Sequence, residues 1–290
     1  MSQSKTLRLL MPQWQGGGNN PAYPLGARLL EWLAPKGNSP TIEVPIKPYD
    51  ASSIQKERGI VEQSVLLEQL QKCTDIIKQH QPEKIIVFGG DCLVEQAPIS
   101  YLNQRYDGNL GVLWMDAHPD VTTPKEFQHE HAMVLGNLLG EGDPVFAAKV
   151  PVKLNPKKVM FGGLPKTTEQ ETEVIQRLGL RQATPFELAD NSHSIVEWIK
   201  EENVTKLFIH IDLDVLDASL FRALLFADPN KEAGFFDHII HGEMTLPQLT
   251  RVVQDTAAVT NVVGVGITEH MPWDAIHLQN MLNQFPLLKD

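Results

Sequence analysis

Two short acidic motifs have residue types and spacings that suit metal chemistry. An Asp-Ala-His-Pro-Asp motif spans 116–120 after the apolar run Leu110–Met115, and an Asp-Leu-Asp motif spans 212–214 where the run Leu207–Leu213 ends. In an extended chain, residues two positions apart face the same side. The spacing therefore predicts that every second residue of each motif points to one place. These residues are Asp116, His118 and Asp120 in the first motif and Asp212 and Asp214 in the second.

The chemistry of this set favours divalent cations. Four carboxylates and an imidazole converging at one sheet edge would repel strongly unless cations lay between them. A single Asp-x-His-x-Asp motif is more often a solvated loop, but burying two such clusters without partners costs several kcal/mol for each group. Oxygen-rich sites with one or two histidines suit Mn²⁺, or less specifically Mg²⁺, Zn²⁺ or Fe²⁺. The sequence therefore predicts a metal site.

Two more strand candidates end in polar residues. A Gly-Gly-Asp-Cys motif at 89–92 follows Lys84–Phe88, and a Thr-Glu-His motif at 268–270 follows Asn261–Ile267. In open α/β sheets, ligands lie beyond the carboxyl ends of the strands. Cys92 and Glu269 are therefore expected at the same edge as the acidic motifs.

The elements that would position these residues alternate along the chain. Short apolar runs bounded by Gly, Pro or Asp predict buried strands, and longer amphipathic segments between them predict helices. This alternation predicts a three-layer α/β/α domain with a mostly parallel central sheet, spanning 1–290. The stretches Gln13–Tyr23 and Phe221–Glu243 are expected to be loops. The further strand candidates are Thr6–Met11 and Lys157–Phe161, and the helix candidates are Ser64–His80, Glu169–Leu178, Ser194–Glu202 and Leu246–Thr256.

Composition narrows the function classes. The 290 residues are 42% hydrophobic and carry a formal net charge of -11, which argues against a nucleic-acid partner. No apolar stretch approaches the roughly 18 residues that span a bilayer, and no secretory signal is evident. Two cysteines do not suggest a disulfide framework. We expect a soluble, cytoplasmic protein with no membrane partner.

The order and intervals of these motifs resemble those of the arginase and agmatinase (ureohydrolase) family. The family carries Gly-Gly-Asp-His, Asp-Ala-His-x-Asp, Asp-x-Asp-x-x-Asp and a late Glu, and the resemblance runs from about Phe88 to Pro272. It implies an arginase-like fold and hydrolysis of a guanidine or related amidine C–N bond in a small molecule. It also implies two Mn²⁺ ions and a homo-oligomer, usually a trimer or hexamer.

Carried over residue by residue, the resemblance implies roles for the site. A hydroxide held between the metals would attack the guanidinium carbon. His131 would pass a proton to the leaving amine, and Glu269 would hold the guanidinium. With the ligand Asp120, these are the implied catalytic residues. The implied metal ligands are Asp116 and Asp212, which would bridge both ions, His118 and Asp214 on one ion, and Asp120 on the other.

Cys92 departs from the pattern because the family has a histidine ligand there. A thiolate binds Zn²⁺ or Fe²⁺ well but suits Mn²⁺ poorly. A changed metal, a weakened second site and a single-metal protein all remain open, as does a cysteine that only packs. His210 stands where a small residue is expected. One hypothesis is that His210 supplies the missing nitrogen ligand; the alternative is a histidine that hydrogen-bonds to its neighbours.

Two features bear on the substrate. The segment Val121–Glu130, which in arginases grips the amino-acid backbone groups, is short and lacks the usual small polar residues. Thr168 stands where the family has an Asp for the α-amino group, so the sequence does not favour L-arginine.

Three alternatives to a ureohydrolase remain. The first is a catalytically impaired arginase-fold protein with one metal, acting as a binding or structural protein. The second is a single-metal amide hydrolase like the deacetylases of this fold, although their tandem His pair is missing. The third is an aspartyl phosphatase based on Asp212 and Asp214, which the late position of this motif disfavours.

Overall fold

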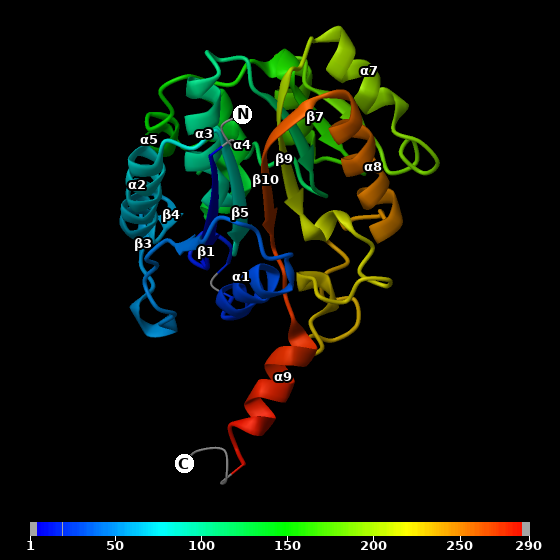
Figure 1. Cartoon of the computed structure of the whole chain (residues 1–290). Helices are drawn as coiled ribbons and strands as arrows, with labels where there is room; N and C mark the ends of the chain where they lie inside the picture. Colours follow the sequence, from blue (N-terminus) through cyan, green and yellow to red (C-terminus); the bar gives the residue numbers. More distant parts are fainter. Residues whose placement is uncertain (1–4, 19, 286–290) are drawn as a thin grey trace.

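The computed structural model describes residues 5–18 and 20–285 and has one large sheet at its centre (Figure 1). All neighbouring strands of this eight-stranded sheet are parallel, which confirms the predicted parallel α/β architecture. A separate two-stranded hairpin consists of β3 (Lys56–Glu57) and β4 (Ile60–Val61). In spatial order the large sheet contains β2 (Thr41–Glu43), β1 (Thr6–Met11), β5 (Lys84–Gly89), β10 (Asn261–Thr268), β9 (Lys206–Asp212), β6 (Gly111–Met115), β7 (Val159–Gly162) and β8 (Arg181–Ala183).

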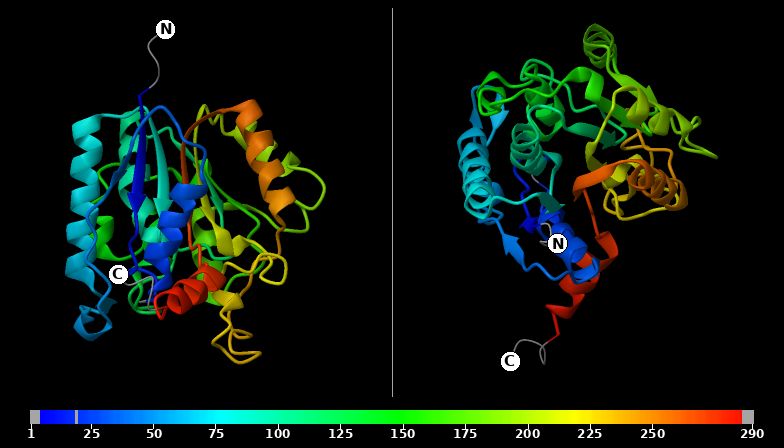
Figure 2. Two further views of the ribbon diagram at one scale, coloured as in Figure 1. Left: turned by 60° about the horizontal axis from the view of Figure 1, so that its bottom comes forward. Right: turned by 45° about the horizontal axis from the view of Figure 1, so that its top comes forward.

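Helices cover both faces of the sheet, as Figure 2 shows, so the three predicted layers are present. Alternate residues of each strand face opposite layers. On β6, Val112 and Trp114 belong to the core under α2, α3 and α4, whereas Leu113 and Met115 belong to the core under α7 and α8. The helices are α1 (Ala22–Leu33), α2 (Gln63–His80), α3 (Gln96–Arg105), α4 (Val134–Leu139), α5 (Pro144–Ala147), α6 (Glu169–Leu178), α7 (His193–Glu201), α8 (Leu246–Val259) and α9 (Trp273–Leu282).

Local sequence signals explain where helices α6 and α8 begin. The side chains of Thr168 and Thr245 each accept the backbone N–H three residues on, and the side-chain oxygens of Glu171 and Gln248 accept the N–H of the N-cap residue. This reciprocal arrangement satisfies backbone donors that the first turn leaves free. It is the reason that both helices lie close to their predicted ranges.

Several predicted bounds were wrong. The expected loop at 13–23 gives way to helix α1, which begins at Ala22. The strand expected from Lys157 begins at Val159, because Pro156–Lys158 forms a 3-10 turn capped by Asn155. Phe221–Glu243 is largely irregular, as predicted, with one short 3-10 turn at Leu225–Ala227. Within the described residues, no helix is long and apolar enough to cross a membrane.

Candidate metal centre

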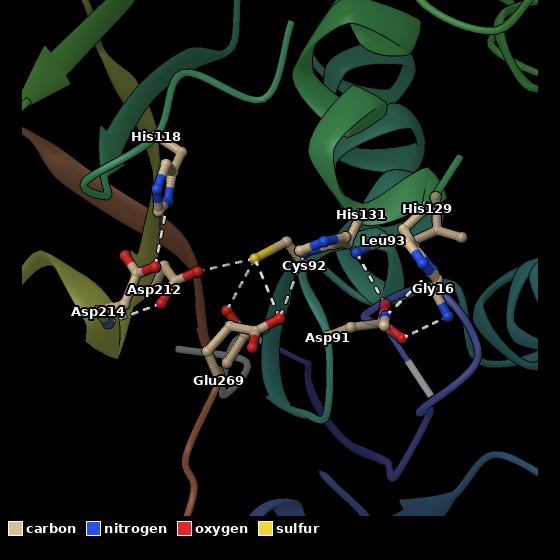
Figure 3. Close-up of polar contacts among 12 residues, drawn as sticks. Gly16, Asp91, Cys92, Leu93, His118, His129, His131, Asp212, Asp214 and Glu269 are labelled. Atoms are coloured by element: carbon tan, nitrogen blue, oxygen red, sulfur yellow. Dashed lines mark hydrogen bonds and ion pairs between the residues drawn. The ribbon is translucent and has the colours of Figure 1, made fainter. Parts of the chain in front are cut away.

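The candidate residues meet at the carboxyl edge of four neighbouring strands. In the sheet order β5, β10, β9, β6, these strands lead to Cys92, Glu269, Asp212 and Asp116, respectively. Figure 3 shows the side chains of Cys92, Asp212 and Glu269 turned toward one another at this edge. Strand pairing between segments far apart in the sequence therefore gathers the site.

Turns, and not strand alternation, make the first acidic motif converge. Strand β6 ends at Met115, and the backbone N–H of His118 donates to Asp116 Oδ1 at 2.7 Å. Asp120 then takes a left-handed φ of +51°, and its carbonyl accepts the N–H of Gly136 at 2.9 Å. The prediction that these side chains come together by strand parity was therefore wrong in its reason, although Asp116 does lie close to both His118 and Asp120.

The second acidic motif also relies on a turn. Asp212 ends β9, and its Oδ1 accepts the N–H of Asp214 at 2.7 Å as the chain enters a 3-10 turn. Asp214 Oδ2 then lies 3.1 Å from His118 Nδ1, and Asp214 Oδ1 accepts the N–H of Ala117 at 3.3 Å. Asp116, His118 and Asp214 thus form one cluster of possible ligands.

Cys92 is buried among acidic and hydroxyl side chains. Its Sγ lies 3.2 Å from Asp212 Oδ2, 3.4 Å from Thr268 Oγ1 and 4.0 Å from Glu269 Oε1. Its possible ligand atom also lies within 4.8 Å of those of Asp116, Asp120 and His210, with all four residues buried. Cys92 therefore sits inside a group of residues able to hold a cation.

Two expected catalytic residues face each other across the site. His131 Nδ1 lies 3.6 Å from Glu269 Oε1, and both group with Cys92 as possible ligands. Glu269 has a left-handed φ of +61°, and its N–H donates to the carbonyl of Gly90 at 2.8 Å. A glutamate in this conformation is uncommon and strained, and such strain is concentrated at functional sites.

Burial and mutual repulsion keep the acidic groups from ionising together. Burial raises the pKa of Asp120, Asp212 and Glu269, and neighbouring carboxylates raise it further. The Cys92 thiol has a raised pKa for the same two reasons. A divalent cation reverses both effects, because it compensates the negative charge and binds the deprotonated ligands. The residues at this edge of the sheet are therefore suited to bind divalent metal ions.

The structure also reveals neighbours that the sequence did not predict. Tyr23, at the start of α1, interacts with the Glu269 carboxyl, and burial, followed by this contact, raises the pKa of the phenol. Glu95 lies 2.9 Å from His210 Nδ1. Neither residue has a sequence signal, because helix packing brings Tyr23 to the site and Glu95 occupies an ordinary short 3-10 turn.

Three residues near the site have local roles. The Asp217 carboxylate accepts the N–H of Ser219 at 2.8 Å, and Thr168 caps α6. His129 accepts the N–H of Gly18 through Nδ1 at 3.2 Å, so the glycine run is tied to the segment that carries His131. The loop expected at Gln13–Tyr23 is therefore held against the site at this point.

The chain thus has a parallel α/β/α sheet with possible Asp and His metal ligands at its carboxyl edge. The arginase family model matches residues 33–224, and the chain belongs to the arginase family. Arginase of Eremothecium gossypii is 24% identical over 299 residues, which cover 95% of this chain and 71% of that protein. Arginase of Staphylococcus aureus strain COL is 27% identical over 139 residues, which cover 46% of each chain.

Solved structures agree with this assignment at the level of the fold. Entamoeba histolytica arginase in complex with L-ornithine superposes with a TM-score of 0.74 and 20% identity, covering 93% of this chain and 91% of that one. The native Bacillus caldovelox arginase gives a TM-score of 0.74 and 21% identity over the same shares.

Proposed function

We propose that this protein is a metal-dependent hydrolase of guanidine or related amidine C–N bonds in small molecules. The observation that carries the proposal is the pairing of His131 with Glu269, 3.6 Å apart, beside two clusters of possible metal ligands. Residues that only hold a structural ion would not require this pair.

The acidic groups and their partners would hold two cations. Asp116 and Asp212 would be shared, His118 and Asp214 would complete one set, and Asp120 would serve the other, on the side of Cys92. When bound, the cations would supply a nucleophile by lowering the pKa of a coordinated water. All these side chains lie at the same sheet edge, which supports the proposal.

Glu269 and His131 would handle the substrate. The Glu269 carboxylate would accept hydrogen bonds from the guanidinium and fix its carbon over the ligand clusters. Water oxygen would add to that carbon, the bond to the substituted nitrogen would break, and urea and an amine would leave. Burial lowers the pKa of His131, so its neutral ring is available to take the water proton and pass it to the amine.

The site lacks the expected contact to an amino-acid end. Thr168 stands where arginases carry an Asp, and its hydroxyl is engaged in the capping box with Glu171. A guanidine without an α-amino group is therefore the proposed substrate class.

Urea release tests the proposal. Protein loaded with Mn²⁺, Zn²⁺ or both is assayed with arginine, agmatine, guanidinobutyrate and guanidinopropionate, with Glu269→Gln as the matched inactive control. Urea from wild type and its loss in the variant support the function. Bound metal with no urea from any guanidine would favour a binding or structural protein instead.

We also propose that the chain acts as one domain in a cytoplasmic homo-oligomer. Strands from both ends of the described chain pair in one sheet, and both cysteines are free. Helix α9 projects from the body (Figure 1) and exposes Leu278 and Met281, which a second subunit would cover. Light scattering coupled to size exclusion tests the assembly.

A further inference from the structure

Four buried side chains on the Cys92 side of the site form a donor set of mixed chemistry. One thiol, one imidazole and two carboxyl groups bring their ligand atoms within 4.8 Å of one another. They come from three different strand ends and from the turn after β6. The residues are Cys92, Asp116, Asp120 and His210.

Three side-chain atoms of this donor set have no hydrogen-bond partner: His210 Nδ1, His210 Nε2 and Asp120 Oδ2. His210 Nε2 and Asp120 Oδ2 are both buried without a hydrogen bond, and His210 Nε2 has only a long contact of 3.5 Å with Asp116 Oδ2. A buried polar atom without a partner costs roughly 1–3 kcal/mol. A cation placed among the four side chains would remove both costs, so these atoms point to a ligand.

Glu95 orients His210 toward the donor set. Its Oε2 lies 2.9 Å from His210 Nδ1, as an ion pair and not as an aligned hydrogen bond, and both side chains are fully buried. A carboxylate on one ring nitrogen keeps the proton there and leaves the other nitrogen free to bind metal. The contact is similar to the carboxylate–histidine pairs found behind many metal-ligating histidines.

Residues on three neighbouring strands are placed so that they hold Glu95 and His210 together. Trp114 on β6, His210 on β9 and Gly266 on β10 are direct partners in the sheet register. The Trp114 and His210 rings stack at 3.6 Å between centroids, and Trp114 Nε1 donates to Asp116 Oδ2 at 3.1 Å. At Gly266, any Cβ atom would overlap the Glu95 carboxyl, so glycine makes room for it.

We infer that Cys92, His210, Asp116 and Asp120 form a thiolate–imidazole–carboxylate centre selective for Zn²⁺ over Mn²⁺, with Glu95 as the positioning residue of His210. Zinc binds Cys sulfur, His nitrogen and Asp oxygen in four-coordinate sites, and a thiolate suits it far better than it suits Mn²⁺. This inference deepens the proposed function and rests on the metal dependence proposed there.

The two halves of the site then differ in metal preference. The cluster of Asp116, His118 and Asp214 contains oxygen and one nitrogen but no sulfur, as Mn²⁺ sites do. A mixed pair of ions, with Zn²⁺ beside Cys92 and Mn²⁺ beside His118, is the expected loading when both metals are supplied.

Cobalt provides a spectroscopic test that does not depend on turnover. Metal-free full-length protein is titrated with Co²⁺ and followed by absorption. A thiolate-to-cobalt charge-transfer band in the near ultraviolet should appear by the second equivalent and disappear in Cys92→Ser. Cys73→Ala is the matched control, because Cys73 is the other buried free cysteine and lies on α2. The Cys73→Ala variant should keep the band.

Competition and second variants test selectivity and geometry. Zn²⁺ should abolish the band at stoichiometric amounts, whereas Mn²⁺ in excess should not. Cys92→His should lower the ratio of Zn²⁺ to Mn²⁺ affinity by about tenfold or more. Glu95→Gln should keep the band but weaken Zn²⁺ binding by about 10–100-fold, as loss of a partner behind a ligand does. Circular dichroism verifies that each variant folds.

The outcomes separate this inference from the proposed function. Cobalt bound without a thiolate band, or an unchanged metal ratio in Cys92→His, would show that Cys92 only packs and would overturn the inference, even if urea is released. A band that depends on Cys92 and persists in a protein without urea release would support the centre and reject the hydrolase.

Discussion

Gly16 and Asp91, 75 residues apart in sequence, are joined by a hydrogen bond from the Gly16 N–H to Asp91 Oδ2 at 3.0 Å. Asp91 also accepts the N–H of Leu93 at 3.1 Å, which shapes the turn that carries Cys92. The carbonyl of Gly16 accepts the N–H of His131 at 3.2 Å. One glycine thus ties the segment bearing Cys92 to the segment bearing His131.

Gly16→Ala is expected to disturb this tie. An added Cβ would lie 2.7 Å and 2.8 Å from the two carboxyl oxygens of Asp91, so one of the residues must shift. Crowding of this kind typically costs about 1–3 kcal/mol of unfolding free energy. Chemical denaturation measures the loss, and Asp91→Asn, which keeps the shape and one acceptor oxygen, should cost less. Equal stability of Gly16→Ala and wild type would contradict the crowding.

Because Glu130 is buried, the unfolding free energy of the protein is expected to fall as the pH rises. Burial raises the pKa of Glu130 to about 9, well above its value in an unfolded chain, while its Oε1 accepts from Asn137 Nδ2 at 2.7 Å. The folded state therefore holds a proton that the unfolded state has lost between about pH 4.5 and 9. One such proton lowers the unfolding free energy by up to about 1.4 kcal/mol per pH unit in that window.

Glu130→Gln should remove this contribution from the metal-free protein. The unfolding free energy of the variant should fall less between pH 5 and pH 9 than that of wild type, and the gap should widen as pH rises. Glu126→Gln changes an exposed carboxyl nearby and should follow the wild-type curve. Parallel curves for wild type and Glu130→Gln would show that Glu130 is ionised in the folded protein.

The sheet and the meeting of the candidate ligand residues could be predicted because their signals are local. Apolar runs identify buried strands, and parallel strands bring their carboxyl ends to one edge, so polar residues that follow those runs must meet. Asp116, Asp212 and Glu269 all follow this rule. The same argument predicted that Cys92 would lie beside the acidic motifs. In the structure, Cys92 Sγ lies 3.2 Å from Asp212 Oδ2.

The environment of these residues could not be predicted in the same way. Tyr23 reaches Glu269 through the packing of α1, across more than 200 positions of sequence, and no periodicity encodes that contact. The left-handed backbone at Asp120 and Glu269 breaks the strand geometry on which spacing arguments depend. Gly266 was a readable signal, because a glycine inside an apolar strand often marks a close approach.

Metal loading should stabilise the protein through Asp116, the proposed shared ligand. A cation that binds only the folded state adds about 2.7 kcal/mol at a free concentration 100 times its dissociation constant. Thermal unfolding of chelated and reloaded protein measures this gain, which Asp116→Asn should largely remove. Asp217→Asn is the control, because that carboxylate serves only the Ser219 turn in the described contacts and should leave the gain intact.

The substrate preference follows from what Thr168 does. Its hydroxyl accepts a backbone N–H at the N-terminus of α6. A threonine has no carboxylate, so this position cannot form an ion pair with the α-amino group of an amino acid. Among guanidines of similar length, kcat/KM should therefore be higher for agmatine or guanidinobutyrate than for arginine. Glu269→Gln should lower kcat/KM for all of them by at least about tenfold, since one charge-assisted contact is worth about 1.5–3 kcal/mol. Glu232→Gln, an exposed change, should not. Arginine as the best substrate would mean that other residues recognise its amino-acid end.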